Sequence, residues 1–271
     1  MSEAIDVRTI VRERYGAIAE GNSCGCGCGC AVDKPESAGA DHHDAVLPAI
    51  GYSSEQAAAI PGESNLGLGC GNPLAHAGVR PGETVLDLGS GAGIDCFLAA
   101  RATGPTGHVI GVDMTSAMID RARAAAKKGG YTNVEFRLAE IEHLPVADAS
   151  VDLVISNCVV NLSPEKEQVF REALRALRPG GRLVVSDLVW LRPMPESIRA
   201  HVDALIGCVA GAVLLDEYLD LMRRAGFMSV EVVEETRYAV GLEGLARDDA
   251  ERQALDSVRS VKVRALKAVR G

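Results

Sequence analysis

From Gly82 onward, short runs of Val, Ile and Leu alternate with longer stretches whose apolar residues recur at helical spacing. The strand-like runs are 84–89, 108–113, 134–140, 151–157, 182–189, 227–240 and 260–269. The helical stretches are 94–102, 116–130 and 164–181, the last closing with Pro179-Gly180-Gly181 as a helix stop. This alternation predicts an α/β fold with a doubly wound, mostly parallel, seven-stranded sheet. A helical insert at 190–225 precedes the last two strands.

The chain before this region divides at about residue 45. Residues 1–20 have apolar positions at helical spacing and predict a short helix. Residues 21–45 are rich in Gly, Cys and Asp and poor in large apolar side chains, so we expect a flexible segment without a core. We therefore expect an N-terminal segment over 1–45 and a folded domain over 46–271, which begins with helix and loop.

Composition narrows the functional classes. Of 271 residues, 47% are hydrophobic and 24% are charged, which is typical of a globular protein. The net charge of −9 and the lack of a Lys/Arg cluster argue against a nucleic-acid partner. Neither a signal peptide nor a long apolar stretch is evident, so we expect a cytoplasmic protein without a membrane partner. In that compartment the eight cysteines are better interpreted as ligands or reactive thiols than as disulfides.

A glycine-rich loop, Asp87-Leu-Gly89-Ser-Gly91-Ala-Gly93, lies between a predicted strand and a predicted helix. Asp113 ends the next strand, where a carboxylate can accept hydrogen bonds from a ribose diol. The G-x-G-x-G spacing differs from the dinucleotide pattern, and Asp87 would repel a pyrophosphate but attract a cation. S-adenosyl-L-methionine has no pyrophosphate and carries an ammonium and a sulfonium. The loop therefore predicts a site for this cofactor.

With these motifs the chain resembles the class I, Rossmann-like methyltransferases that use S-adenosyl-L-methionine. The residues that this resemblance places around the cofactor are Asp87, Gly89 and Gly91 at the methionine moiety, Asp113 and Met114 at the ribose and adenine, Glu140 and Ile141 beside the adenine, and Asn157 closing the site. Glu140 departs from the commoner Asp but keeps the acceptor. We expect a side chain added at Gly89 to enter the space of the ligand.

Three cysteines are candidates for holding the methyl acceptor. Cys158 follows a strand directly, at the sheet edge where ligands of open α/β folds bind. Cys70 lies in the glycine-rich run NLGLGCGNP and Cys208 in the insert, so both could join Cys158 over the cofactor. Cys96 falls on the first helix of the sheet region, where core packing explains it.

The spacing of these thiols bears on the atom that they hold. Structural zinc usually has four ligands in close sequence pairs, whereas three scattered thiolates suit a pyramidal, thiophilic ion such as arsenite.

NLGLGCGNP, DLGSGAGIDCFLAA, GYTNVEFRLAEIEHLPV, VISNCVVNLSP and GCVAGA resemble bacterial arsenite methyltransferases, over about residues 15–233. The resemblance implies that Cys158 and Cys208 hold arsenic, with Cys70 as third ligand. It also implies a fourth, N-terminal cysteine able to form a disulfide with Cys70. Here Cys24, Cys26, Cys28 and Cys30 alternate with glycine instead of forming the family's Cys-Cys pair, so each of the four, Cys30 among them, is a candidate for this fourth cysteine. His42 and His43 are interpreted as solvated.

We therefore expect an arsenite methyltransferase that acts on arsenite and methylarsenite, with a thiol reductant such as thioredoxin or glutathione. Two alternatives stay open at this point. A methyltransferase acting on carbon or oxygen of a small organic molecule would need a base, for which His143 is the only near candidate. A non-catalytic protein that sequesters the metalloid would need the thiols but not the cofactor.

Overall fold

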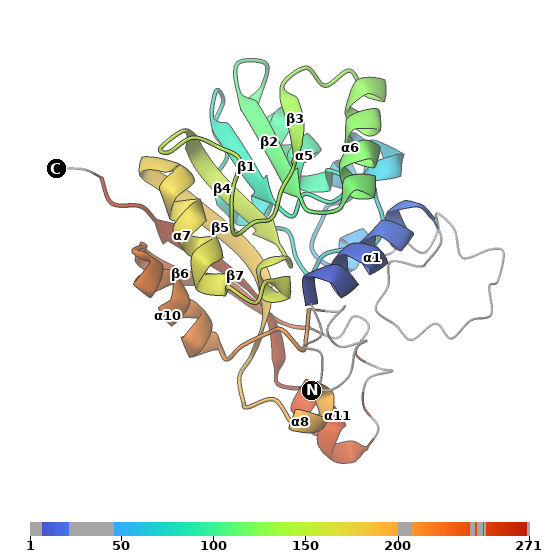
Figure 1. The fold of residues 1–271 in the computed structure, drawn as a ribbon, viewed down its shortest axis with the longest axis vertical. Coiled ribbons are helices and arrows are strands. Elements are labelled where there is room, and N and C mark those ends of the chain that lie inside the picture. Colours follow the sequence, from blue (N-terminus) through green and yellow to red (C-terminus); the bar gives the residue numbers. More distant parts are fainter. Residues whose placement is uncertain are drawn as a thin grey trace.

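A seven-stranded sheet forms the centre of the protein (Figure 1). The computed structural model describes residues 7–21, 46–199, 208–238, 242, 246 and 248–269. The strands are β1 (Thr84–Leu88), β2 (His108–Asp113), β3 (Val134–Leu138), β4 (Val151–Asn157), β5 (Leu177–Trp190), β6 (Met228–Arg237) and β7 (Val258–Leu266). Their order is β3-β2-β1-β4-β5-β7-β6. The first five run parallel and β7 is antiparallel to both neighbours, which confirms the predicted mostly parallel sheet.

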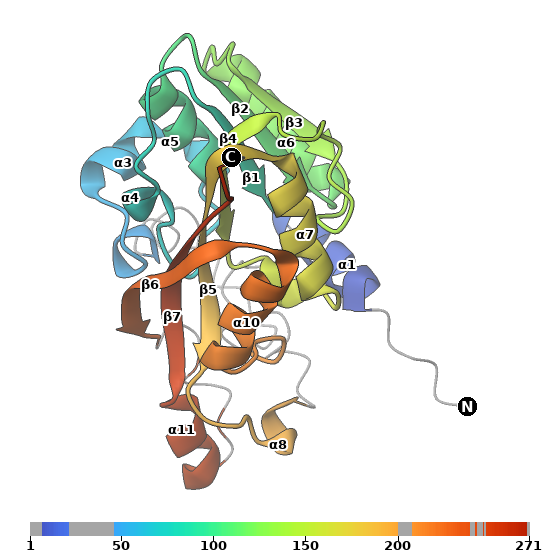
Figure 2. The same ribbon diagram turned by 90° about the vertical axis from the view of Figure 1, so that its left-hand side faces the viewer.

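Helices cover both faces of this sheet (Figure 2). They are α1 (Val7–Ala19), α3 (Ser54–Ala59), α4 (Leu74–Ala77), α5 (Ile94–Thr103), α6 (Ser116–Lys128), α7 (Lys166–Ala176), α8 (Glu196–Arg199), α10 (Leu215–Ala225) and α11 (Asp249–Leu255). Short 3-10 helices occupy η1 (Gly62–Ser64) and η2 (Val160–Leu162). Among the described residues, no helix is long and apolar enough to cross a membrane.

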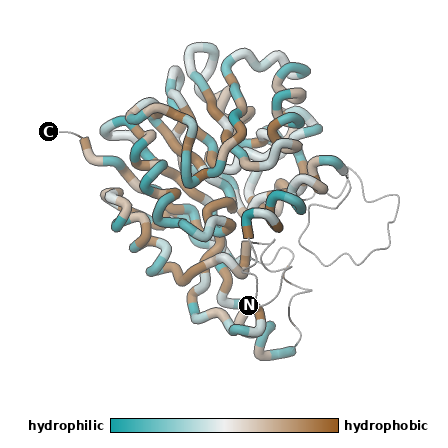
Figure 3. Tube along the Cα trace, in the orientation of Figure 1, coloured by the Kyte–Doolittle hydropathy of each residue, from teal (hydrophilic) through white to brown (hydrophobic). Residues whose placement is uncertain are grey.

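Alternate residues of the strands supply two separate cores. Val85, Val109 and Leu153 face α5 and α6, whereas Leu86 and Ile110 face the side covered by α7 and α10. Because both faces are buried, the central strands are apolar throughout, as parallel strands must be. Figure 3 shows this as hydrophobic colour along the strands and hydrophilic colour on the outer helix surfaces.

The structure corrects two predicted boundaries. The helix predicted over 164–181 ends at Ala176, and the Pro-Gly-Gly run lies within β5. Leu177 pairs with Val151 of β4, and a register shift follows before Arg182 pairs with Leu153. Gly180, with φ of 78°, takes up this irregularity.

The predicted helical insert is also interrupted. The structure describes α8 and α10 there, and residues 208–214 between the undescribed stretch and α10 form turns and extended chain rather than helix. Cys208 therefore lies in a turn, with φ of 60°. The helix α11 between the last two strands was not predicted; the Asp248 side chain caps it by accepting a hydrogen bond from the backbone N–H of Glu251 at 2.8 Å.

The N-terminal helix α1 confirms the helix predicted within 1–20. Arg8 and Arg12 on α1 pair with Glu140, just beyond the carboxyl end of β3. Tyr15 and Ile18 pack against Leu66. These contacts place α1 across the sheet edge where the parallel strands end. The predicted flexible segment, with Cys24, Cys26, Cys28, Cys30, His42 and His43, lies outside the described residues.

Candidate active site

The glycine-rich loop connects β1 to α5 through three left-handed residues. Gly89, Gly91 and Gly93 have φ of 66°, 51° and 96°, which only glycine adopts without strain. A Cβ on Gly91 would have no described atom within 4 Å, whereas a Cβ on Gly89 would lie 2.4 Å from Cγ2 of Val159. A side chain on Gly89 would therefore clash with Val159, and its entry into ligand space stays a prediction. Gly89 allows Val159 to approach, and Gly91 is the glycine that borders open space.

Asp113, at the end of β2, is fixed by backbone donors. Its Oδ2 accepts a hydrogen bond from the N–H of Gly91 at 3.0 Å, and its Oδ1 accepts one from Thr115 at 2.8 Å. Burial raises the pKa of this carboxyl. The neighbouring Oγ of Ser90 is buried and has no hydrogen-bond partner within the described part of the chain. An unpaired hydroxyl beside a fixed carboxylate fits a polar ligand at this loop.

Asp87 lies deeper, at the end of β1. Its Oδ2 accepts a hydrogen bond from the Cys96 thiol at 3.2 Å, and burial raises its pKa well above the ordinary value, with a further contribution from Asp95. Cys96 is fully buried in the core, where its pKa is also raised by burial. This thiol packs under the loop and is not part of the cysteine group described below.

Glu140 and Ile141 follow β3 beneath α1. The Glu140 carboxylate is 3.2 Å from Arg12 Nη2, so an ion pair with α1 engages the acceptor that the sequence assigned to adenine. Ile141 is buried in the core, and Met114 is half-buried beyond β2. Desolvation and the charges of Cys208, Cys158 and Asp113 raise the pKa of Tyr15 on α1. Tyr15 is thus within electrostatic reach of both the cysteines and Asp113.

Asn157, the last residue of β4, joins the cofactor side to the cysteine side. Its Nδ2 donates to the Gly71 carbonyl at 2.7 Å and to Oδ2 of Asp95 at 3.2 Å. Its Oδ1 accepts from the backbone N–H of Cys70 at 3.1 Å. Tyr52 completes the group: its hydroxyl accepts from Asn157 at 2.9 Å and donates to Asp95 at 2.8 Å. Asn157 therefore lies under the Cys70 loop as well as beside the glycine loop.

The sequence analysis did not select Tyr52 or Asp95. Asp95 opens α5 two residues after the last loop glycine, and that position could have indicated a role. Tyr52 lies in a segment whose sequence carries no comparable signal.

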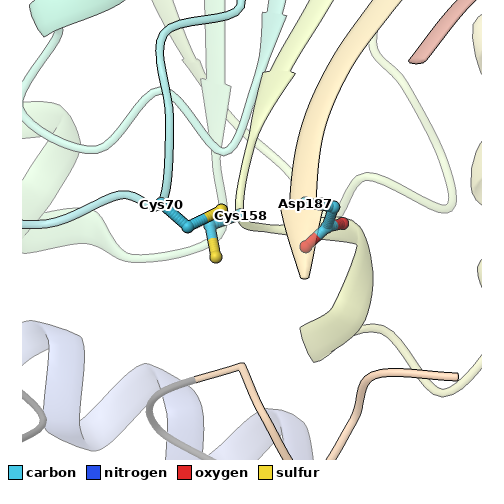
Figure 4. A group of neighbouring side chains, drawn as sticks. All are labelled: Cys70, Cys158 and Asp187. Carbon is cyan, nitrogen blue, oxygen red and sulfur yellow. The ribbon is translucent and has the colours of Figure 1, made fainter. Parts of the chain in front are cut away.

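Cys70, Cys158 and Cys208 meet at the carboxyl edge of the sheet, as predicted (Figure 4 shows the first two). Cys158 leaves β4 with φ of 59°, and its N–H donates to the Ser186 carbonyl of β5 at 2.8 Å. The Cys208 thiol donates to the Cys158 carbonyl at 2.8 Å, and the Cys70 thiol contacts the Ser186 carbonyl at 3.6 Å. Two cysteines in left-handed conformation indicate local strain that the surrounding contacts maintain.

Burial favours the protonated form of Cys70 and Cys158. Desolvation is the largest cause that raises the pKa of Cys70 and of Cys158. For Cys158, hydrogen bonds with Cys208 and Cys70 raise the pKa further. The sulfurs of Cys70 and Cys158 lie within 4.8 Å of each other, and the Cys208 thiol reaches the carbonyl of Cys158. The site is therefore a group of soft sulfur donors suited to a thiophilic centre that displaces their protons.

Asp187 on β5 was missed by the sequence analysis. A carboxylate oxygen of Asp187 and the sulfurs of Cys70 and Cys158 all lie within 4.8 Å of one another (Figure 4). Burial raises the pKa of this carboxyl to about 7. The available signal was an acidic residue inside an otherwise apolar strand, at the same edge as Cys158.

Comparison with known proteins identifies the family of this chain. The family model of a methyltransferase domain matches residues 80–226. An arsenite methyltransferase from Halobacterium salinarum is 46% identical over 98% of this chain and 68% of its own length. The chain belongs to the family of the arsenite methyltransferases.

Two further relatives extend the match. An arsenite methyltransferase from Aquipseudomonas alcaligenes is 41% identical over 66% of this chain and 53% of its own length, so the chain spans about half of that relative. The crystal structure of an arsenic(III) S-adenosylmethionine methyltransferase from Chlamydomonas reinhardtii is 35% identical, with a TM-score of 0.64 over 84% of this chain and 74% of that chain.

The contact between Gly89 and Val159 generates a stability prediction. Gly89→Ala should lower the free energy of unfolding by about 2–3 kcal/mol, because the new Cβ combines a left-handed conformation with a steric clash. Gly91→Ala, which faces open space, should cost about 1–2 kcal/mol. Adding Val159→Ala to Gly89→Ala should restore part of the lost stability. Urea unfolding of the wild type, Gly89→Ala, Gly91→Ala and the double variant measures these free energies. Equal stability of Gly89→Ala and Gly91→Ala would contradict the assigned contact.

The buried carboxyl of Asp95 predicts a pH dependence. Burial raises its pKa from 3.8 to about 6, so the folded protein binds this proton more tightly than the unfolded chain. The stability that this proton contributes is complete below pH 4 and is lost as the pH rises through 6. Relative to Asp95→Asn, the wild type should lose roughly 3 kcal/mol of unfolding free energy between pH 4 and 7. Denaturant unfolding tests this. The exposed Asp120→Asn variant is the control, and a pH-independent difference for Asp95→Asn would refute the assignment.

Proposed function

We propose that this chain transfers the methyl group of S-adenosylmethionine to trivalent arsenic held by the sulfurs of Cys70, Cys158 and Cys208. The observation that carries the proposal is the meeting of three thiols, from three separate segments, at the carboxyl edge beside the glycine loop; Cys70 and Cys208 are buried and Cys158 is half-buried. Soft sulfur donors select a thiophilic ion, and three of them match the three bonds of arsenite. The arsenite methyltransferases among its relatives share this chain's family.

On the cofactor side, residues of this chain bind and orient S-adenosylmethionine. When bound, S-adenosylmethionine supplies an electrophilic methyl group on its sulfonium. Asp113, which two backbone N–H groups hold in place, would accept hydrogen bonds from the ribose hydroxyls. Met114 would lie beside the adenine. Asp87 faces the ammonium end, and Gly91 lets the ligand approach the backbone. Glu140 and Ile141 border the adenine under α1.

On the acceptor side, the thiols exchange their protons for arsenic. Each of Cys70, Cys158 and Cys208 forms a sulfur–arsenic bond, and its proton leaves with a hydroxyl of arsenite as water. The raised pKa values of Cys70 and Cys158 therefore do not prevent binding, because no free thiolate is needed beforehand. Arsenic bonded to three sulfurs would keep a lone pair that could accept the methyl group as its bond to the sulfonium breaks, with S-adenosylhomocysteine as the leaving group. Positioning of these atoms is the main contribution to the rate, worth roughly 7–11 kcal/mol.

Asn157 connects the cofactor side of the site to the cysteine side. Its amide ties the Cys70 backbone to Asp95 on α5, the helix that begins at the glycine loop. This contact fixes the distance between one arsenic ligand and the cofactor loop. We assign Asn157 as the residue that closes the cofactor site and positions the acceptor loop.

Methyl transfer raises the formal oxidation state of arsenic, so two electrons must return before the next transfer. We assign them to cysteines of this chain and to a thiol reductant such as thioredoxin or glutathione. Among the N-terminal cysteines of the segment over 1–45, Cys30 is the candidate for pairing with Cys70. Methylarsenite is the proposed second substrate.

A methyltransferase with an organic acceptor would require a general base beside that acceptor, close to Cys70, Cys158 and Cys208. His143, the candidate for that base, is instead exposed and borders a pocket with Glu165 and Gln168. The arsenic acceptor is the better-supported reading.

The roles of the cysteines predict a substrate-dependent pattern. Cys158→Ser and Cys208→Ser should abolish methylation of both arsenite and methylarsenite, because two sulfurs are the minimum that holds either. Methylarsenite already carries one carbon and offers two positions to sulfur, so Cys70→Ser should reduce its methylation less than that of arsenite.

The measurement uses methyl-labelled S-adenosylmethionine, each arsenical and excess thiol, followed by arsenic speciation. Cys96→Ser, which changes a buried thiol outside the group, is the matched control and should methylate both substrates. Full activity of Cys158→Ser, or equal loss of both activities in Cys70→Ser, would refute this division of roles.

A further inference from the structure

The acceptor site contains one donor that arsenite does not use. Asp187 places a carboxylate oxygen within 4.8 Å of the sulfurs of Cys70 and Cys158, and all three side chains are buried (Figure 4). They come from three elements: the loop before α4, the end of β4 and strand β5. Trivalent arsenic bonded to three sulfurs has no requirement for this oxygen.

Two sulfurs and an oxygen are a ligand set for a tetrahedral divalent cation. Zinc binds cysteine sulfur at about 2.3 Å and carboxylate oxygen at about 2.0–2.2 Å. Neighbouring sulfurs in such a site are about 3.7 Å apart, so the described atoms need to close by only about 1 Å. We infer that Cys70, Cys158 and Asp187 form a binding site for Zn²⁺ or a similar thiophilic divalent cation. Cys208 or water fills the fourth position.

The hydrogen bonds of Asp187 leave room for a metal. Its Oδ1 accepts from Asn161 at 2.7 Å and from the Leu188 N–H at 3.0 Å, and its Oδ2 accepts from the Tyr218 hydroxyl at 3.0 Å. A carboxylate offers about four lone-pair positions, so one remains on Oδ2. Donors that hold a ligating carboxylate in this way are the usual outer contacts of a metal site.

The charges of the group also suit a divalent ion. Zn²⁺ with two thiolates is neutral, and the Asp187 carboxylate adds one negative charge. Lys166 interacts electrostatically with Asp187 and is half-buried, with Nζ donating to the carbonyls of Asn161 at 3.1 Å and Ser163 at 2.9 Å. This cation offsets the added charge. Binding releases the two thiol protons to solvent.

Such an ion occupies two of the sulfurs that arsenite requires. The cation and arsenite should therefore compete, a consequence that rests on the proposed function. The binding site itself does not rest on it.

Zinc binding to the full-length chain tests the inference. The four cysteines Cys24, Cys26, Cys28 and Cys30 are first replaced by serine, because they would bind zinc independently. Calorimetric titration with Zn²⁺ alone should give one site per chain. Asp187→Asn should weaken zinc by roughly 10–100-fold, and Tyr218→Phe should weaken it by roughly tenfold. Arsenite affinity should change less than zinc affinity in both variants.

Asp152→Asn, a carboxylate at the opposite end of β4, is the matched control and should bind zinc normally. Unchanged zinc affinity in Asp187→Asn, or in Cys158→Ser, overturns the site. If the Asp187→Asn chain fails to fold, Tyr218→Phe and Co²⁺ absorption decide. Cys70→Ser should weaken the sulfur-to-cobalt band, because one thiolate ligand is lost, and an unchanged band overturns the site. Intact zinc binding without arsenic methylation contradicts the proposed function alone.

Discussion

The side-chain amide of Asn157 is the contact on which the geometry of the acceptor site depends. It ends a buried central strand, so its position is fixed by the sheet, and it holds the backbone of Cys70 and Gly71 from below. The same amide reaches Asp95 at the start of the helix that follows the glycine loop. A loop with little core of its own is thereby given the rigidity of the sheet. The distance between acceptor sulfur and cofactor loop follows from this one side chain.

Burial is the second constraint, and it determines the protonation of two of the thiols. Because desolvation raises the pKa of Cys70 and Cys158, these two neighbouring sulfurs do not carry adjacent negative charges. In the proposed complex, arsenite would remove the protons together with its own hydroxyls and leave a neutral complex in the same desolvated space. Asp187 adds a buried carboxyl with a pKa of about 7 beside these sulfurs.

Much of this arrangement could be predicted from the sequence because strand and helix periodicity fixes the sheet, and the sheet fixes which residues share its carboxyl edge. Cys158, Asp113 and the glycine loop are predictable in that way. Asp187, Tyr52 and the contact between Gly89 and Val159 are not, since they depend on side-chain directions and on segments brought together only by packing. The predicted C-terminal end of α7 was wrong for a related reason. Pairing of Leu177 with β4 outweighed the helical pattern of the local sequence.

The central claim is that three sulfurs of the folded domain hold arsenic. X-ray absorption at the arsenic edge measures this directly on the full-length chain with Cys24, Cys26, Cys28 and Cys30 replaced by serine and arsenite bound. The account predicts three sulfur neighbours and no oxygen in the first shell of arsenic. Two sulfurs with one oxygen in this protein, identical to the shell of its Cys70→Ser variant, would contradict it.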